Sequence, residues 1–169
     1  MPKHINKLLL AALLTLSQLA YSATLKPYPE DIATPKLILK DLSGKSHNLA
    51  DYKGKVVLVQ FWATYCIPCA KEMPTMNKLM KKMGDKHFKI LAVDMGETKA
   101  EVEAFVTKVK PKFTILLDPS GQTIQRWKVF VSPSNFIIGP SGKIRYTLFG
   151  GVQWDSQKMV DDLKKLAAK

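Results

Sequence analysis

The two cysteines of the chain lie three positions apart, shortly after an apolar run that reads KVVLVQFW. This run, residues 55–62, is short and rich in β-branched side chains, so it predicts a buried strand. Cys66 and Cys69 follow in ATYCIPC, where Pro68 suits the first turn of a helix because its missing N–H costs little there. The sequence therefore predicts a strand that delivers Cys66 to the N-terminus of a helix.

A helix N-terminus stabilises a negatively charged sulfur, because unpaired backbone N–H groups and the positive end of the helix dipole face it. The pKa of the Cys66 thiol is therefore expected to fall from about 8.5 to below about 7.5. Cys69 lies one turn further on the same face, so the sulfurs can join with little movement of the backbone. Such a small ring is a poor stabiliser, and it suits exchange between one exposed attacking sulfur and one recessed resolving sulfur.

Other roles for the cysteine pair are less well supported. A zinc site needs about four ligands, and His4, His47 and His87 have no ligand-like spacing to the pair. Haem attachment needs a histidine directly after the second cysteine, where this chain has Ala70. The sequence thus favours redox exchange, with no metal and no cofactor.

One alternative of a different class stays open, which is a non-catalytic module that binds a soft metal such as Cu(I) through both thiols. A stripe of methionines between Met73 and Met83 could add thioether ligands. Their helical spacing is better explained by packing in the core. Copper titration of the reduced protein would distinguish the two interpretations.

Residues 1–22 have the three-part pattern of a secretory signal peptide: a basic start, an apolar run at residues 8–19, and small residues before a cleavage point after Ser22. The apolar run is shorter than the roughly twenty residues that span a membrane, which argues against an anchor. We therefore expect a periplasmic or other extracytoplasmic location, where two thiols tend to pair. An extended lead-in, residues 23–35, and one domain, residues 36–169, would follow.

The chain carries 26 Lys and Arg against 14 Asp and Glu, a net charge of +12. The basic residues are nearly all lysines and are scattered, and only Arg126 and Arg145 offer a guanidinium group to a phosphate. We interpret the charge as a basic, soluble surface. Export also argues against a nucleic-acid partner, and the protein is predicted to be a monomer.

Alternation of strand and helix patterns predicts an α/β fold. A hairpin at residues 36–48 should be followed by strands at 55–62, 88–93 and 113–117, with helices at 68–83 and 97–110 and a brief helix toward Trp127. Strands at 134–138 and 143–149 are joined by four residues, which predicts an antiparallel pair, and a helix at 155–168 ends the chain. The expected architecture is a central mixed sheet with helices on both faces.

The stretch FWATYCIPC at the end of an apolar strand resembles the thioredoxin superfamily. The following CAKEMP, the export signal, the N-terminal hairpin, the extra helix at residues 97–110 and the segment FIIGPSGKI are more similar to TlpA/ResA-like extracytoplasmic oxidoreductases. The resemblance covers most of residues 36–169 and is specific around residues 61–74 and 132–143. It implies a thioredoxin-like fold with an N-terminal β-hairpin and a helix inserted mid-domain.

The resemblance also implies roles for individual residues. Cys66 would attack the substrate and Cys69 would resolve the mixed disulfide, so that Cys66–Cys69 is the redox-active disulfide. Pro133 would be a cis-proline that faces the cysteines and turns the backbone of Ser132 toward the substrate. The residues expected to contact substrate are Trp62, Tyr65, Pro68, Ser132 and Pro133.

Glu72 is expected to serve as a third catalytic residue. It lies one turn beyond Cys69 on the same helical face, where burial under the sheet would raise its pKa and allow it to relay a proton to or from Cys69. The family has a glutamate at this motif position, whereas cytosolic thioredoxins carry a buried acid on the preceding strand. This chain has Gln60 there, which cannot take a proton.

These inferences combine into one functional expectation. The chain would exchange disulfides with protein thiol or disulfide substrates outside the cytoplasm, more readily as a reductant than as an oxidant. Family analogy suggests apocytochrome c thiols as substrates and a membrane-bound upstream redox partner. The sequence names neither the substrate nor the direction of electron flow.

Overall fold

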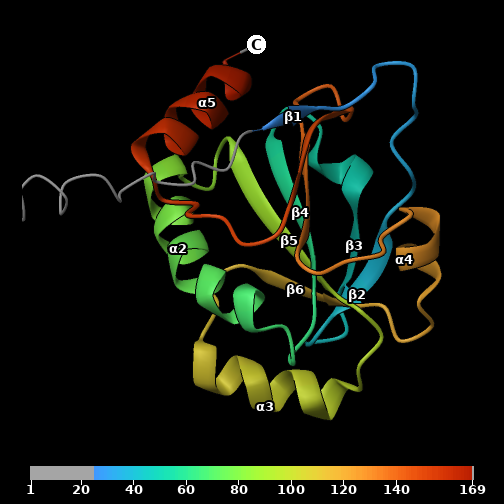
Figure 1. Ribbon diagram of the computed structural model, residues 1–169. Helices are drawn as coiled ribbons and strands as arrows, with labels where there is room; N and C mark the ends of the chain where they lie inside the picture. The colour runs from blue at the N-terminus through green and yellow to red at the C-terminus, as the bar shows by residue number, and fades with distance from the viewer. Residues whose placement is uncertain (1–24, 169) are drawn as a thin grey trace, which may run out of the picture.

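Eight strands form one mixed sheet in the computed structural model of the protein, which describes residues 25–168 (Figure 1). The predicted signal peptide and its cleavage point lie outside these residues. The strands are β1 (Lys26–Pro27), β2 (Ile38–Asp41), β3 (Ser46–Asn48), β4 (Val56–Trp62), β5 (Phe88–Asp94), β6 (Thr114–Leu117), β7 (Ser134–Ile138) and β8 (Ile144–Phe149). The helical elements are η1 (Leu49–Tyr52), α2 (Ile67–Met83), α3 (Lys99–Val109), α4 (Gln122–Arg126) and α5 (Gln157–Ala167).

The strand order in the sheet is β1-β8-β7-β4-β5-β6-β2-β3. Strands β4, β5 and β6 are parallel, as expected for strands linked through helices, whereas β7 pairs antiparallel with β4 and with β8. The N-terminal hairpin, β2 and β3, extends the sheet by antiparallel pairing of β2 with β6. The α/β fold class, the element order and the mixed sheet predicted from the sequence are confirmed.

Strand β4 lies near the middle of the sheet, and all seven of its residues are buried. Because successive side chains point to opposite faces, this strand contributes to two cores. One core, under α2, α3 and α5, receives Val56, Leu58 and Trp62. The other core, under α4 and η1, receives Val57, Val59 and Phe61. Burial on both faces fixes the position at which β4 ends and the cysteine motif begins.

Helix α2 begins and ends where the sequence predicts, within one residue. Its fully buried Met73 and Met76 belong to the core, in agreement with the packing interpretation of the methionine stripe. Gly84 follows the helix with a φ of 74°, a backbone conformation that favours glycine. Lys81 and Lys82 are exposed in the last turn. Their positive charges are favourable there because they face the negative end of the helix dipole.

Two short elements were not predicted. Lys26 and Pro27, expected to be part of an extended lead-in, form β1 by pairing antiparallel with Thr147 and Tyr146 of β8. A single 3-10 turn, η1, follows the hairpin and is capped by the side chain of Asn48. Both elements are too short to have a periodic pattern. Strand β1 is defined by its pairing with β8, and η1 by the local cap from Asn48.

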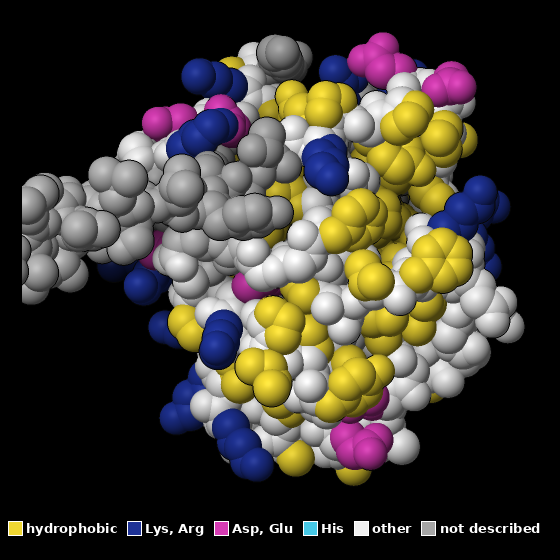
Figure 2. All heavy atoms as spheres, viewed as in Figure 1, with side chains coloured by type: hydrophobic (Ala, Val, Ile, Leu, Met, Phe, Trp, Pro, Cys, Tyr) yellow, Lys and Arg dark blue, Asp and Glu magenta, His cyan; other side chains and the backbone are white. Residues whose placement is uncertain are grey.

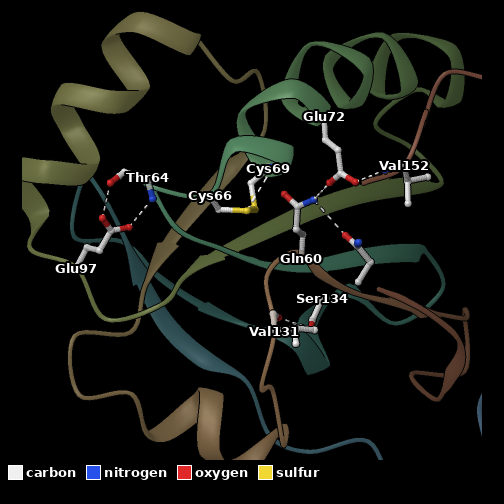
Figure 3. Close-up of a disulfide and its surroundings, with 10 residues drawn as sticks. Gln60, Thr64, Cys66, Cys69, Glu72, Glu97, Val131, Ser134 and Val152 are labelled. Atoms are coloured by element: carbon white, nitrogen blue, oxygen red, sulfur yellow. Dashed lines mark hydrogen bonds between the residues drawn. A yellow bond between two sulfur atoms is a disulfide. The ribbon is translucent and has the colours of Figure 1, made fainter. Parts of the chain in front are cut away.

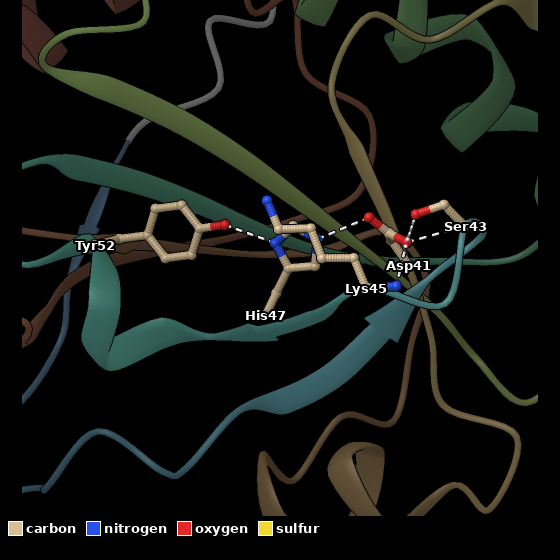
Figure 4. A network of polar contacts seen from close by, with 5 residues as sticks. All are labelled: Asp41, Ser43, Lys45, His47 and Tyr52. Atoms are coloured by element: carbon tan, nitrogen blue, oxygen red, sulfur yellow. Dashed lines mark hydrogen bonds and ion pairs between the residues drawn. The ribbon is translucent and has the colours of Figure 1, made fainter.

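The hairpin is held together by a polar network around His47 (Figure 4). The His47 ring contacts Asp41 through Nε2 at 2.8 Å and the hydroxyl of Tyr52 through Nδ1 at 2.7 Å. Hydrogen bonds from the Ser43 side chain and from His47 hold the pKa of Asp41 well below its ordinary value. The histidine at position 47 thus has a structural role on β3, at the far edge of the sheet from β1.

None of the helices within residues 25–168 has the length and apolar character that crossing a membrane requires.

Candidate active site

The strand-to-helix junction carries the cysteine motif (Figure 3). After β4, residues 63–65 form a turn in which the Cys66 N–H donates to the Ala63 carbonyl at 3.1 Å. Cys66 is the N-cap of α2, and its Sγ accepts the backbone N–H of Cys69 at 3.3 Å. Pro68 lies in the first turn. The sulfur of Cys66 therefore sits where the unpaired N–H groups of the helix point, as the sequence predicts.

The two cysteines form a disulfide, with their Cα atoms 5.3 Å apart. Cys69 is fully buried, and Cys66 retains 6% of its surface exposed. Cys66 is the more exposed of the two, but both cysteines are buried, so the exposed attacking sulfur expected from the sequence is not seen in the disulfide form. The reason is that the Cys66 sulfur turns towards Cys69, to which it is bonded.

The segment before β7 lies at the same end of the sheet as the cysteines. Phe61 of β4 pairs with Ser134 of β7, and the Ser132–Pro133 peptide bond directly before it is cis. Pro133 is buried and Ser132 is half-buried. The chain after β8 also reaches this end, since Gly150 donates its N–H to the Pro133 carbonyl at 3.0 Å. The structure thus brings the predicted cis-proline to the edge of the sheet where β4 delivers Cys66.

Glu72 is buried on the side of α2 that faces the sheet, with 2% of its surface exposed. Burial raises the pKa of its carboxyl from the ordinary 4.5 to about 7, because an uncompensated charge is costly away from water. Its Oε1 accepts the backbone N–H of Val152, and its Oε2 accepts from Nε2 of Gln60 at 2.5 Å. Glu72 is therefore a buried acid poised near neutral pH, three residues from Cys69.

Gln60 connects three elements, which the sequence did not reveal. Its Nε2 on β4 donates to Glu72 on α2 and to Oδ1 of Asn135 on β7, the latter at 3.1 Å. Its Oε1 is buried and has no hydrogen-bond partner among the described residues. Figure 3 shows the Gln60 amide between the disulfide and Glu72. The only signal for this role is one amide in the otherwise apolar run VVLVQFW.

The remaining residues predicted to contact substrate differ in their accessibility. Tyr65 is 73% exposed, and Pro68 is exposed beside Gly151. Trp62, in contrast, is fully buried, with its ring 5.0 Å from that of Phe105 on α3. Trp62 points into the core because it shares the face of β4 on which Leu58 packs. It has no surface to offer a substrate in this state, so its placement indicates a packing role.

A second acidic contact at this end was also missed. Thr64, two residues before Cys66, donates its backbone N–H and its hydroxyl to the two carboxylate oxygens of Glu97. The helical pattern at residues 97–110 predicts a helix that starts at Glu97, whereas α3 begins at Lys99. Thr98 is its N-cap and forms a capping box with Glu101, so the pattern TKAE marks the true start.

Across the described part of the chain, no three His, Cys, Asp or Glu side chains are arranged to hold a metal ion.

Comparison with known proteins gives consistent results. Residues 31–147 match the AhpC/TSA family. The thiol-disulfide oxidoreductase ResA of Bacillus thuringiensis is 37% identical over 132 residues, which cover 78% of this chain and 75% of that protein. A Chlorobium tepidum crystal structure, provisionally described as the thiol:disulfide interchange protein DsbE, has a TM-score of 0.75 at 28% identity and covers 82% of this chain and 98% of that one. The exposed lipoprotein thioredoxin Etrx1 of Streptococcus pneumoniae has a TM-score of 0.67 at 28% identity, over 78% and 99% of the two chains.

Proposed function

The chain belongs to the AhpC/TSA family of thioredoxin-like proteins and is a thiol-disulfide oxidoreductase, and from this premise we propose that it reduces disulfides of protein substrates outside the cytoplasm. The observation that carries the proposal is the Cys66–Cys69 disulfide, with Cys66 as the N-cap of α2 and Cys69 buried behind it. We propose Cys66, Cys69 and Glu72 as the catalytic residues, within one domain at residues 36–169 that β1 (Lys26–Pro27) joins as an edge strand.

The proposed reaction has two steps. The Cys66 thiolate attacks a substrate disulfide, forms a mixed disulfide and releases one substrate thiolate. Cys69, after losing its proton, attacks the Cys66 sulfur, releases the second substrate thiolate and regenerates the Cys66–Cys69 disulfide. Two electrons pass to the substrate, so a separate thiol donor must reduce the pair again. We propose a membrane-bound protein as that donor.

The location is proposed from the signal-peptide pattern at residues 1–22. It agrees with the description of the similar pneumococcal thioredoxin as an exposed lipoprotein. A disulfide formed between the thiols of apocytochrome c is one substrate in keeping with the proposal, since its reduction would return those thiols. The copper-binding alternative gains no support, because the similar proteins are described as thiol-disulfide oxidoreductases. The burial of Met73 and Met76 is explained by packing in the core.

The direction of electron flow has a direct test. Equilibration of the protein with glutathione or dithiothreitol redox buffers gives the reduction potential of the pair. As a reductant the protein should have a potential nearer to about −270 mV, the thioredoxin value, than to about −120 mV, the DsbA value. A potential near the DsbA value would contradict the reductase role and favour an oxidase, while leaving exchange itself intact.

Apolar side chains around the disulfide are proposed as the docking surface for the substrate. Tyr65 and Ile67 flank Cys66 and are 73% and 69% exposed. Phe130, directly before Val131 and the cis peptide bond, is 88% exposed. Phe149 is also exposed, and it pairs with Ser134 next to Pro133. Figure 2 shows hydrophobic side chains gathered across one face, with most lysines and arginines toward its margins.

We expect Phe130→Ser to weaken the use of protein substrates without changing the chemistry. Loss of a large exposed anchor should lower kcat/KM for a protein disulfide by about tenfold, mainly through KM. The rate with glutathione disulfide, which is too small to cover the surface, should stay unchanged. Ile38→Ser is the matched control, because Ile38 is 56% exposed on β2, away from β4 in the sheet. Equal effects of the two variants would contradict this docking surface.

A further inference from the structure

Two acids that the proposed reaction does not use lie beside the segment that precedes Cys66. Asp94 is the last residue of β5 and pairs in register with Trp62, the last residue of β4. Glu97 follows three residues later, and its carboxylate accepts both hydrogen-bond donors of Thr64, the backbone N–H at 2.6 Å (Figure 3). The segments that follow β4 and β5 are therefore joined by the hydrogen bonds from Thr64 to Glu97.

Asp94 is fully buried and only half satisfied by hydrogen bonds. Its Oδ2 accepts the backbone N–H of Glu97 at 2.9 Å, whereas its Oδ1 has no partner among the described residues. Burial, together with the neighbouring Glu97 carboxyl, raises the pKa of Asp94 to about 7. Two neighbouring carboxylates, one of them fully buried, repel each other when both are charged, which favours a proton on one of them.

No cation described in residues 25–168 forms an ion pair with either acid. The charged groups on the adjoining elements are engaged elsewhere. On α3, Lys99 pairs with Glu103, and Glu101 binds Thr98 in the capping box. The carboxylate of Asp118, after β6, accepts the backbone N–H groups of Thr123 and Ile124. A proton is thus the available means of neutralising the pair.

We propose that Asp94 and Glu97 share one proton and, through Thr64, hold the segment before Cys66 in the position required for disulfide exchange. This inference rests on the proposed function of Cys66. Both acids are positioning residues, because they act through Thr64. With the proton present on Asp94, this acid is neutral and Glu97 keeps the two hydrogen bonds from Thr64.

Loss of the shared proton has a defined consequence. Two neighbouring negative charges repel each other, which weakens the hold of Glu97 on Thr64. The segment before Cys66 is then no longer held in place by the hydrogen bonds from Thr64 to Glu97. Exchange per Cys66 thiolate should therefore fall as the pH rises through about 7.

The test uses the full-length protein with Glu72→Gln, because Glu72 titrates in the same range. In this background the backbone amide signal of Thr64 in NMR spectra should titrate between pH 6 and 8.5. Exchange with glutathione disulfide, corrected for the fraction of thiolate, should fall by about fivefold over that range. Adding Asp94→Asn, which replaces the proton donor by an amide of the same shape, should abolish both changes.

Glu101→Gln is the matched control, since Glu101 is an exposed acid on the adjacent helix, and it should leave both changes in place. A Thr64 amide that does not titrate in the Glu72→Gln protein would overturn the proposal, even if Asp94→Asn failed to fold. An unchanged fall in exchange after Asp94→Asn would overturn it as well. Failure of the proposed function would look different, because the Thr64 amide would titrate although no variant exchanged disulfides.

Discussion

Replacing Cys66 with serine is expected to abolish disulfide exchange, and replacing Cys69 with serine is expected to stop the reaction halfway. Without the Cys66 sulfur no mixed disulfide can form, since Cys69 is fully buried and cannot meet a substrate. Turnover of a protein disulfide should fall by at least about 1,000-fold, as when a catalytic nucleophile is removed. Insulin reduction coupled to a thiol donor provides the measurement.

The two variants should differ in what they leave behind. Cys69→Ser retains the attacking sulfur but cannot release its partner, so substrate should stay covalently attached to Cys66. Non-reducing electrophoresis with mass spectrometry would identify the adduct and, in cell extracts, the partner. Cys66→Ser should trap nothing. Adducts formed by Cys66→Ser, or by neither variant, would contradict the assignment of the two sulfurs.

The second large effect is expected from Glu72→Gln. Cys69 must lose its proton before it attacks, and Glu72, whose pKa is raised to about 7, is the buried base three residues away. Removing a general base of this kind should slow release of the mixed disulfide by about 100-fold. In the unsubstituted protein the release rate should rise with pH through about 7, because the base must be deprotonated, and this rise should disappear in the variant.

The same substitution should stabilise the fold at alkaline pH. The folded protein holds the Glu72 proton more tightly than the unfolded chain does. The contribution of Glu72 to the free energy of unfolding is therefore fully present below about pH 4.5 and is lost as the pH rises through about 7. A rise of the pKa from 4.5 to about 7 corresponds to about 3 kcal/mol between the two protonation states. In urea unfolding at pH 8 the Glu72→Gln protein should therefore be more stable than the unsubstituted protein, although it exchanges disulfides more slowly.

Glu103→Gln, a change at an exposed acid of α3, is the control for both measurements. An unchanged rate of release across the pH range would contradict the relay. A loss of stability at pH 8 would instead show that the Glu72 carboxylate is well solvated or well paired in the fold.

The sequence was sufficient to predict the architecture because its local signals agree with its tertiary contacts. The run KVVLVQFW, for example, is buried on both faces as a short apolar strand should be. Equally local rules predict other features: Cys66 at the start of α2, Gly84 at its end, and the apolar face that α5 buries. Strand β1 could not be predicted in the same way, since two residues become a strand only through pairing with β8.

The polar network of the site was predicted only in part. The burial of Glu72 follows from its place on the inner face of α2, but its partners come from β4 and from the loop after β8. Likewise, Thr64, Asp94 and Glu97 meet only because β4 and β5 end at the same level in the sheet. Such contacts depend on strand register, and β4, which is buried on both faces, has no alternation of polar and apolar residues from which its register could be predicted.

The central claim, that Cys66 is the activated sulfur, is tested most directly by alkylating the reduced protein with iodoacetamide across pH and mapping the label by mass spectrometry. The account predicts that Cys66 is labelled first, with a half-maximal rate below about pH 7.5, while Cys69 stays protected. Labelling of Cys69 first, or a midpoint for Cys66 at about 8.5 or above, the value of an ordinary thiol, would contradict it.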